Sequence, residues 1–135
     1  MTDFEYIAKG YCKYAPGKSL KEQTGNIPCK YGVYLFHRNS KDGEILYIGK
    51  SGTITVEGTF GEQSLKKRIN NKKSKNLKRE DWLIEQFNND SSLKRICIEW
   101  LVIDEKQYLP GYVEACLIQQ FYNQYKRLPL WNNRF

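Results

Sequence analysis

The chain has 135 residues, of which 40% are hydrophobic and 27% are charged, and its net charge is +7. This length and composition suffice for one globular domain with its own hydrophobic core. No apolar run reaches membrane-spanning length, and the N-terminus lacks the basic start and apolar stretch of a signal peptide, so we expect a cytoplasmic protein with no membrane partner. The positive charge favours polyanionic partners, although solubility alone accounts for it equally well.

The first strands are expected after an N-terminal extension, residues 1–30, whose turn signals leave its structure undefined. Residues 32–38 and 44–50 are typical of the two strands of a hairpin, joined through "NSKDG". An insertion rich in Gly and Thr, residues 51–64, then predicts a loop or a small extra hairpin that turns at Glu57–Gly58.

Helical spacing dominates much of the second half of the chain. "QSLKKRINNK" and "EDWLIEQFNN" have this spacing, and the alternation in "KRICIEWLVID" predicts a third strand. Residues 111–125 form the clearest helix, with an apolar stripe made of Val113, Leu117, Ile118, Phe121, Tyr122 and Tyr125. The order β-β-α-α-β-α predicts a single α+β domain over residues 1–135, with a small three-stranded antiparallel sheet flanked by helices.

Basic residues cluster in Ser64–Arg79, "SLKKRINNKKSKNLKR", which contains eight of them and no acidic residue. Each Lys or Arg placed at a phosphate releases condensed counterions, and the ten tyrosines of the chain offer rings on which bases can stack. We therefore expect contacts with nucleic acid at Lys66, Lys67, Lys72, Lys73 and Lys75.

Two motifs resemble catalytic sites but fail on inspection. "GEILYIGKS" almost matches a phosphate-binding loop, but five residues separate Gly43 from Gly49 and "ILYI" is typical of a strand. His37 is the only histidine, and a lone histidine at a strand end is typical of the surface. Acid–base chemistry must therefore come from tyrosine, lysine or carboxylate.

Tyr34 and Tyr47 are expected on one face of the hairpin. A turn at Asp42–Gly43 leaves them on the same face, and a loop centred on Ser40–Lys41 makes them direct cross-strand neighbours. Cross-strand aromatic packing is one explanation. Glycines such as Gly49 favour another, because glycine weakens a strand and often marks a place where another group approaches the backbone.

Glu114 and Arg68 are the other candidates that the pattern selects. Glu114 shares the apolar stripe of its helix with Leu117 and Ile118, so its carboxylate requires an ion pair, hydrogen bonds or a cation such as a hard divalent metal. Arg68 lies next to Leu65 and Ile69 and so flanks the buried face of its helix. This position suits either a bidentate contact to a phosphoryl oxygen or a surface arginine with a buried stem.

These motifs together resemble the GIY-YIG nuclease superfamily. "GVY" is followed by "YIGK", whose tyrosine lies thirteen residues after the first, then by an arginine on a helix, a glutamate on a helix and "LPLWN". The resemblance covers Gly32 to Asn132. It implies a small antiparallel sheet flanked by helices, and hydrolysis of DNA phosphodiester bonds with one divalent metal, Mg²⁺ or Mn²⁺.

The resemblance also implies how water would be activated. Tyr34 and Tyr47 would orient or deprotonate the attacking water, and Lys50 would assist the deprotonation or hold a phosphate. A phenol has a pKa near 10, so its use as a base requires positive charge nearby. Lys50 and Arg68 would supply that charge.

Further roles follow from the later motifs. Arg68 would stabilise the pentavalent phosphorus, Glu114 would bind the metal, and Asn132, in preference to Asn133, would order the site by hydrogen bonds. Many relatives carry His or Tyr one helical turn after the arginine, where this chain has Lys72, so the identity of the base is open.

The resemblance covers most of the chain and no second domain follows it, so we expect a stand-alone endonuclease. It would be a restriction-type enzyme, as a homodimer that cuts both strands, or a poorly specific nuclease, or a nuclease that depends on an unidentified protein partner. The alternative is a catalytically inactive module of the same fold that binds nucleic acid. Lys72 is the feature that favours this alternative.

Overall fold

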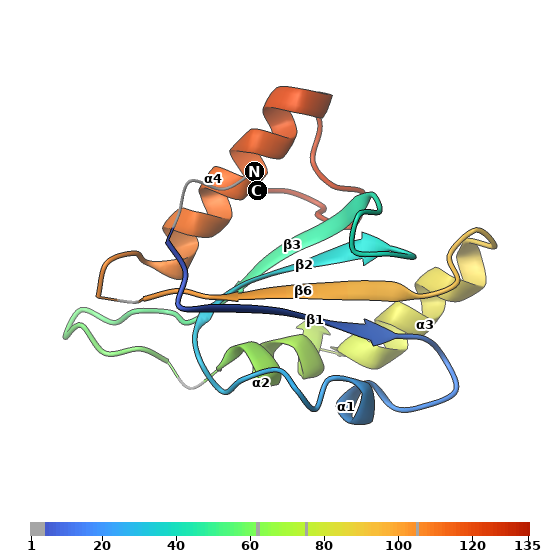
Figure 1. The fold of residues 1–135 in the computed structure, drawn as a ribbon, viewed down its shortest axis with the longest axis horizontal. Coiled ribbons are helices and arrows are strands. Elements are labelled where there is room, and N and C mark those ends of the chain that lie inside the picture. Colours follow the sequence, from blue (N-terminus) through green and yellow to red (C-terminus); the bar gives the residue numbers. More distant parts are fainter. Residues whose placement is uncertain (1–4, 62, 75, 105) are drawn as a thin grey trace.

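A four-stranded antiparallel sheet carries helices on both of its faces (Figure 1). This computed structural model describes residues 5–61, 63–74, 76–104 and 106–135, with residues 72–74 described by their backbone only. In chain order the elements are β1 (Ala8–Tyr14), α1 (Leu20–Gln23), β2 (Gly32–Arg38), β3 (Ile45–Ser51), α2 (Leu65–Asn70), β4 (Lys72–Ser74), β5 (Leu77–Lys78), α3 (Arg79–Asn89), β6 (Ile96–Val102) and α4 (Pro110–Tyr125). Among the described residues, no helix is long and apolar enough to cross a membrane.

The sheet has four strands, in the order β1-β6-β2-β3, and not the three that the sequence predicts. The predicted strands correspond to β2, β3 and β6, with β3 shifted by one residue, and the α+β class is confirmed. The additional strand is β1, within the extension of undefined structure. It was missed because, as an edge strand, it directs Gly10, Cys12 and Tyr14 toward the core, which is a weak apolar signal.

The two faces of the sheet have separate cores. One face packs against α1, α2 and α3 through a cluster that includes Tyr34, Phe36 and Leu65, and the other packs against α4 through Val33 and Leu117. Figure 1 shows α4 above the sheet and the other three helices below it. Because side chains alternate along a strand, β2 and β3 contribute to both cores, and a side chain's position in the strand decides which helix layer it meets.

Two features of the helices depart from the predicted pattern. α4 begins at Pro110, whose fixed φ suits the first turn, and buries its stripe up to Phe121, whereas Tyr122 and Tyr125 are exposed. α2 begins after Ser64, whose hydroxyl accepts a hydrogen bond from the Lys67 amide, and ends at Asn70. Lys72 therefore begins β4 and is not one helical turn beyond Arg68.

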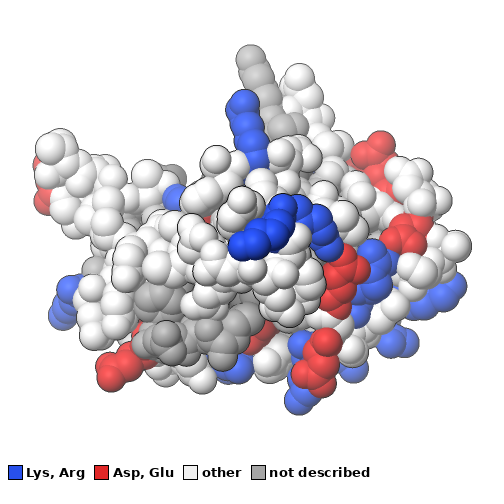
Figure 2. Space-filling view, turned by 90° about the horizontal axis from the view of Figure 1, so that it is seen from above, with Lys and Arg blue, Asp and Glu red and all other residues white. Residues whose placement is uncertain are grey.

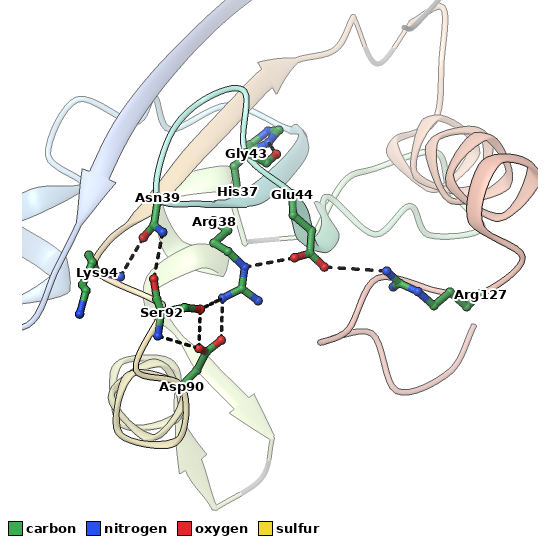
Figure 3. Close-up of polar contacts among 9 residues, drawn as sticks. All are labelled: His37, Arg38, Asn39, Gly43, Glu44, Asp90, Ser92, Lys94 and Arg127. Carbon is green, nitrogen blue, oxygen red and sulfur yellow. Dashed lines mark hydrogen bonds and ion pairs between the residues drawn. The ribbon is translucent and has the colours of Figure 1, made fainter.

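Polar contacts fix the turn end of the β2–β3 hairpin (Figure 3). Arg38 donates to Asp90 Oδ2 (2.6 Å), to Ser92 Oγ (2.9 Å) and to Glu44 Oε1 (3.1 Å), and Arg127 lies 3.8 Å from the other oxygen of Glu44. Hydrogen bonds from Ser92, followed by that from Arg38, lower the pKa of Asp90 to about 2. The hairpin turn, the loop after α3 and the segment after α4 are thereby joined.

His37 is buried, which makes its predicted place on the surface wrong. Its Nε2 lies 2.9 Å from Glu99 Oε1 and its Nδ1 lies 3.1 Å from the Gly43 carbonyl oxygen. Burial lowers the pKa of His37, but the hydrogen bonds to Glu99 and Gly43 outweigh burial and raise the pKa above its usual value. Both ring nitrogens face acceptors, so a protonated imidazole satisfies the site.

Candidate active site

A cavity of about 340 Å³ lies beside the edge strand β3. Its lining residues come from β2, β3, the segment after β3, α2 and α4. They include five side chains that the sequence selects, namely Tyr34, Tyr47, Lys50, Arg68 and Glu114. The fold therefore brings together polar groups from four separate elements of the chain.

The two tyrosines enter the cavity from adjacent strands in a register that neither predicted turn gives. Tyr34 pairs with Gly49, and Tyr47 pairs with Phe36, so both phenols lie on the face covered by α1, α2 and α3. Their ring centroids are 6.1 Å apart. The prediction that they share one face is confirmed.

Gly49 makes room for the ring of Tyr34. A Cβ atom at this position would lie 2.4 Å from Tyr34 Cζ and 2.6 Å from its hydroxyl oxygen, which no packed structure tolerates. The close approach that a strand glycine indicates is therefore made here by a tyrosine of the same sheet.

The environment of Tyr34 keeps its phenol protonated. Tyr34 is fully buried. Burial raises its pKa to about 12, the Arg79 charge opposes burial, Tyr47 adds to the increase, and Arg68 opposes it. At neutral pH Tyr34 therefore offers a hydroxyl that can donate a hydrogen bond.

Positive and negative groups face one another across the cavity. Lys50 is on β3, Arg68 is on α2, and Glu114 is in the first turns of α4. Burial raises the pKa of Glu114, and the charges of Lys50 and Arg68 partly oppose this increase. Among the described residues that line the cavity, Glu114 is the only carboxylate.

A structural metal cage is not present among the described residues, where no group of three or more His, Cys, Asp and Glu side chains could hold an ion. One carboxylate fits a different kind of metal site. Mg²⁺ retains several waters and is often held by one or two carboxylates together with substrate phosphates. The donor set around Glu114 fits that use.

The segment after β3 forms one wall of the cavity, to which Gly52, Gly61 and Gln63 contribute. An antiparallel bridge joins Ile54 to Phe60, so the predicted small hairpin is present. Phe60 stacks on Tyr31 with ring centroids 5.1 Å apart, and the Tyr31 hydroxyl donates to the Gly61 carbonyl oxygen (2.5 Å). The segment just before β2 thus supports this wall.

Asn132 does not line the cavity. Its side chain accepts a hydrogen bond from the Ile48 amide (3.0 Å) and donates one to the Ile48 carbonyl oxygen (3.0 Å). The amide of Trp131 donates to the Leu46 carbonyl oxygen (2.9 Å), so the C-terminal segment pairs with the outer edge of β3. Asn133 is exposed.

Arg79, the first residue of α3, was not selected from the sequence, yet it touches the site. Its side chain is fully buried, and its Nη2 donates to the Tyr34 hydroxyl oxygen (3.0 Å). In the sequence it ends a basic run and therefore resembles a solvated side chain. The only signal is its position three residues before Trp82, whose ring it contacts.

The lysines expected to contact nucleic acid are only partly described. Lys67 is exposed, whereas Lys66 Nζ donates to the Gly25 carbonyl oxygen (3.1 Å). The side chains of Lys72 and Lys73, and all of Lys75, lie outside the described residues. Figure 2 looks onto the α4 side, where basic and acidic side chains are interspersed and large areas are uncharged. The basic run on α2 belongs to the opposite side of the sheet (Figure 1).

Comparison with curated proteins finds a distant similarity. The chain is 29% identical over 125 residues to UvrABC system protein C of Dictyoglomus thermophilum, an alignment that covers 82% of this chain and 18% of that protein. The chain thus spans less than a fifth of the length of this relative. No family model matches the chain. No solved structure matches it either.

Proposed function

We propose that the protein is a metal-dependent endonuclease that hydrolyses DNA phosphodiester bonds at the cavity beside β3. The observation that carries this proposal is the convergence of two tyrosines, a lysine, an arginine and a glutamate on one cavity from four elements. Packing alone does not require that combination. Phosphodiester hydrolysis has a use for every one of these side chains, because the reaction needs an oriented water, compensation of phosphoryl charge and a carboxylate for a divalent ion.

The tyrosines and Lys50 would act on the water. Tyr34 is protonated at neutral pH, because burial raises its pKa to about 12, so its part is to orient the water or a phosphoryl oxygen by donating a hydrogen bond. Removal of the proton then falls to Tyr47 or Lys50, which line the same cavity. In this proposal the general base is therefore a residue of β3.

Arg68 and Glu114 would act on the phosphate. The guanidinium of Arg68 suits the phosphoryl oxygens on which negative charge accumulates in the transition state. Glu114 would hold the metal, which when bound supplies Lewis-acid stabilisation of the leaving oxygen. Asn132 would keep β3 in place through its two hydrogen bonds to Ile48, and so would support Tyr47 and Lys50 indirectly.

Two further findings support a nuclease. The ordered motifs from Gly32 to Asn132 resemble the GIY-YIG superfamily, and the similarity to UvrABC system protein C points to the same activity. DNA is the proposed partner, because the net charge of +7 favours a polyanion.

Plasmid cleavage with Mg²⁺ or Mn²⁺ tests the proposal. Glu114→Gln keeps the shape of the side chain and removes its charge, so we expect nicking to fall by a factor on the order of 10² or more. Glu85→Gln is the matched control, because Glu85 is exposed on α3. The Glu85→Gln protein should cut like the wild type. EDTA should abolish cutting by both active proteins.

The products and the binding data separate the remaining possibilities. Linear plasmid formed without accumulation of nicked circles would indicate two cooperating copies, whereas nicked circles alone would indicate single-strand cleavage. A wild type that binds DNA in a salt-sensitive manner but does not cut with either metal would contradict the proposal, and would identify the chain as an inactive nucleic-acid-binding module.

A further inference from the structure

Arg79 is held in a setting that is unusual for a charged side chain. Its guanidinium carbon lies 5.2 to 5.8 Å from the centroids of four aromatic rings, those of Tyr34, Phe36, Tyr47 and Trp82. The side chain is fully buried, and the backbone amide donates to the Asn71 carbonyl oxygen (3.1 Å). The charge is thus enclosed by aromatic rings on the inner side of the candidate active site.

The hydrogen bonds of Arg79 are incomplete. Within the described part of the chain, the Tyr34 hydroxyl accepts from Nη2, and neither Nε nor Nη1 has a hydrogen-bond partner. No described carboxylate forms an ion pair with it. Cation–π contacts compensate part of the desolvation cost, yet a buried charge without a counter-ion is often less stable than an apolar side chain of similar volume. Stability alone therefore does not explain an arginine here.

The chemistry of the guanidinium determines the direction of the single hydrogen bond. Arginine has donors and no acceptor, so the hydroxyl oxygen of Tyr34 must be the acceptor. The hydroxyl hydrogen of Tyr34 cannot point at Arg79 and must find another acceptor. Tyr34 lines the cavity, so a water or a phosphoryl oxygen bound there can accept it.

We infer that Arg79 is a positioning residue, which directs the Tyr34 hydroxyl hydrogen into the cavity and stabilises negative charge that develops on the hydroxyl oxygen. Its part in DNA cleavage rests on the proposed function. Its electrostatic effect on Tyr34 does not, and can be measured in a protein that cuts nothing.

The electrostatic effect is measured by replacing Tyr34 with a fluorinated tyrosine and following its ¹⁹F chemical shift against pH. The fluorinated phenol is more acidic than that of tyrosine, so it titrates in a pH range where the protein is folded. Arg79→Met keeps an unbranched chain among the rings and removes the charge and the donor. It should raise the apparent pKa of the fluorinated phenol by about one unit or more, a tenfold change in the ionisation constant. Arg79→Lys should give a smaller shift, and Arg134→Met, a change at an exposed arginine, should give none.

Stability and activity together separate positioning from simple packing. We expect Arg79→Met to unfold in urea at the wild-type concentration or higher, while its nicking rate falls by about tenfold to a hundredfold. In a Tyr34→Phe background, which lacks the acceptor, Arg79→Met should cause little further loss. If Arg79→Met does not fold, stability and nicking rate are compared in Arg79→Lys instead.

An unchanged ¹⁹F titration in Arg79→Met and Arg79→Lys would overturn the inference. The inference would also be overturned by an Arg79→Met protein that is less stable than the wild type but fully active per folded molecule, because Arg79 would then contribute to packing alone. A wild type that cuts no DNA, combined with the expected ¹⁹F shift, would reject the nuclease and leave the electrostatic link between Arg79 and Tyr34 established.

Discussion

Replacing Asn132 with alanine should destabilise the protein through the loss of two hydrogen bonds. The Asn132 side chain satisfies both the amide and the carbonyl of Ile48 on the outer edge of β3, each at 3.0 Å. A hydrogen bond of this type contributes about 0.5–1.5 kcal/mol net, so the pair corresponds to about 1–3 kcal/mol. Asn132 is partly exposed and water can replace some of the lost contacts, so we expect about 1–2 kcal/mol.

Urea unfolding monitored by tryptophan fluorescence measures this loss, and the neighbouring Asn133 is the matched control. Asn133 is exposed, so Asn133→Ala should change the free energy of unfolding by less than about 0.5 kcal/mol. Asn132→Asp should fall between the two, because a carboxylate still accepts from the Ile48 amide but cannot donate to its carbonyl oxygen. Equal stability of Asn132→Ala and Asn133→Ala would refute the idea that this side chain closes the edge of β3.

Two further predictions concern the tyrosine pocket and the hairpin turn. Gly49→Ala forces a methyl group against the buried ring of Tyr34 and should lower the free energy of unfolding in urea by about 1–3 kcal/mol. Gly25→Ala is the control, because its new methyl group would meet an ordinary contact at 3.5 Å and should be tolerated. Equal unfolding midpoints for the two variants would disprove the close approach at Gly49. The pKa of Asp90 is lowered to about 2 in the folded protein, so its contribution to stability is present above its unfolded value of about 3.9 and is lost as the pH falls through about 2. Unfolding midpoints measured from pH 5 to pH 2 should therefore decline less steeply for Asp90→Asn than for the wild type, and parallel curves would contradict this.

The strands and helices that carry their own periodicity were predictable. "GVYLFHR" and "ICIEWLV" are apolar enough to indicate buried strands, and the stripe from Val113 to Phe121 indicates the face of α4 that packs on the sheet. β1 was not predictable, because "AKGYCKY" directs only a glycine, a cysteine and a tyrosine toward the core. Its place beside β6 depends on pairing between residues far apart in the chain, which no local pattern records.

Polar site residues that belong to a sequence motif could also be predicted. Those whose surroundings are set by tertiary packing could not. The spacing of Tyr34 and Tyr47 is visible in the sequence. Arg79 is the last of a run of basic residues, and its spacing from Trp82 indicates only one of the four rings around it. Glu99 gave a usable signal, because a carboxylate inside an apolar strand needs a partner and the chain has a single histidine. The structure gives Glu99 such partners in His37, at 2.9 Å, and Lys9, at 3.5 Å.

The contacts at the turn of the β2–β3 hairpin have a consequence for how the domain opens. Arg38, Asp90 and Glu44 cross-link the end of the hairpin that lies away from the cavity (Figure 3). At the other end, the 52–61 hairpin leaves the sheet, and Tyr31 contacts it by stacking on Phe60 and by donating to the Gly61 carbonyl oxygen. Amide hydrogen exchange should therefore be slow in the central strands, and fastest in the cavity wall, where local opening admits solvent without disturbing the remainder of the sheet.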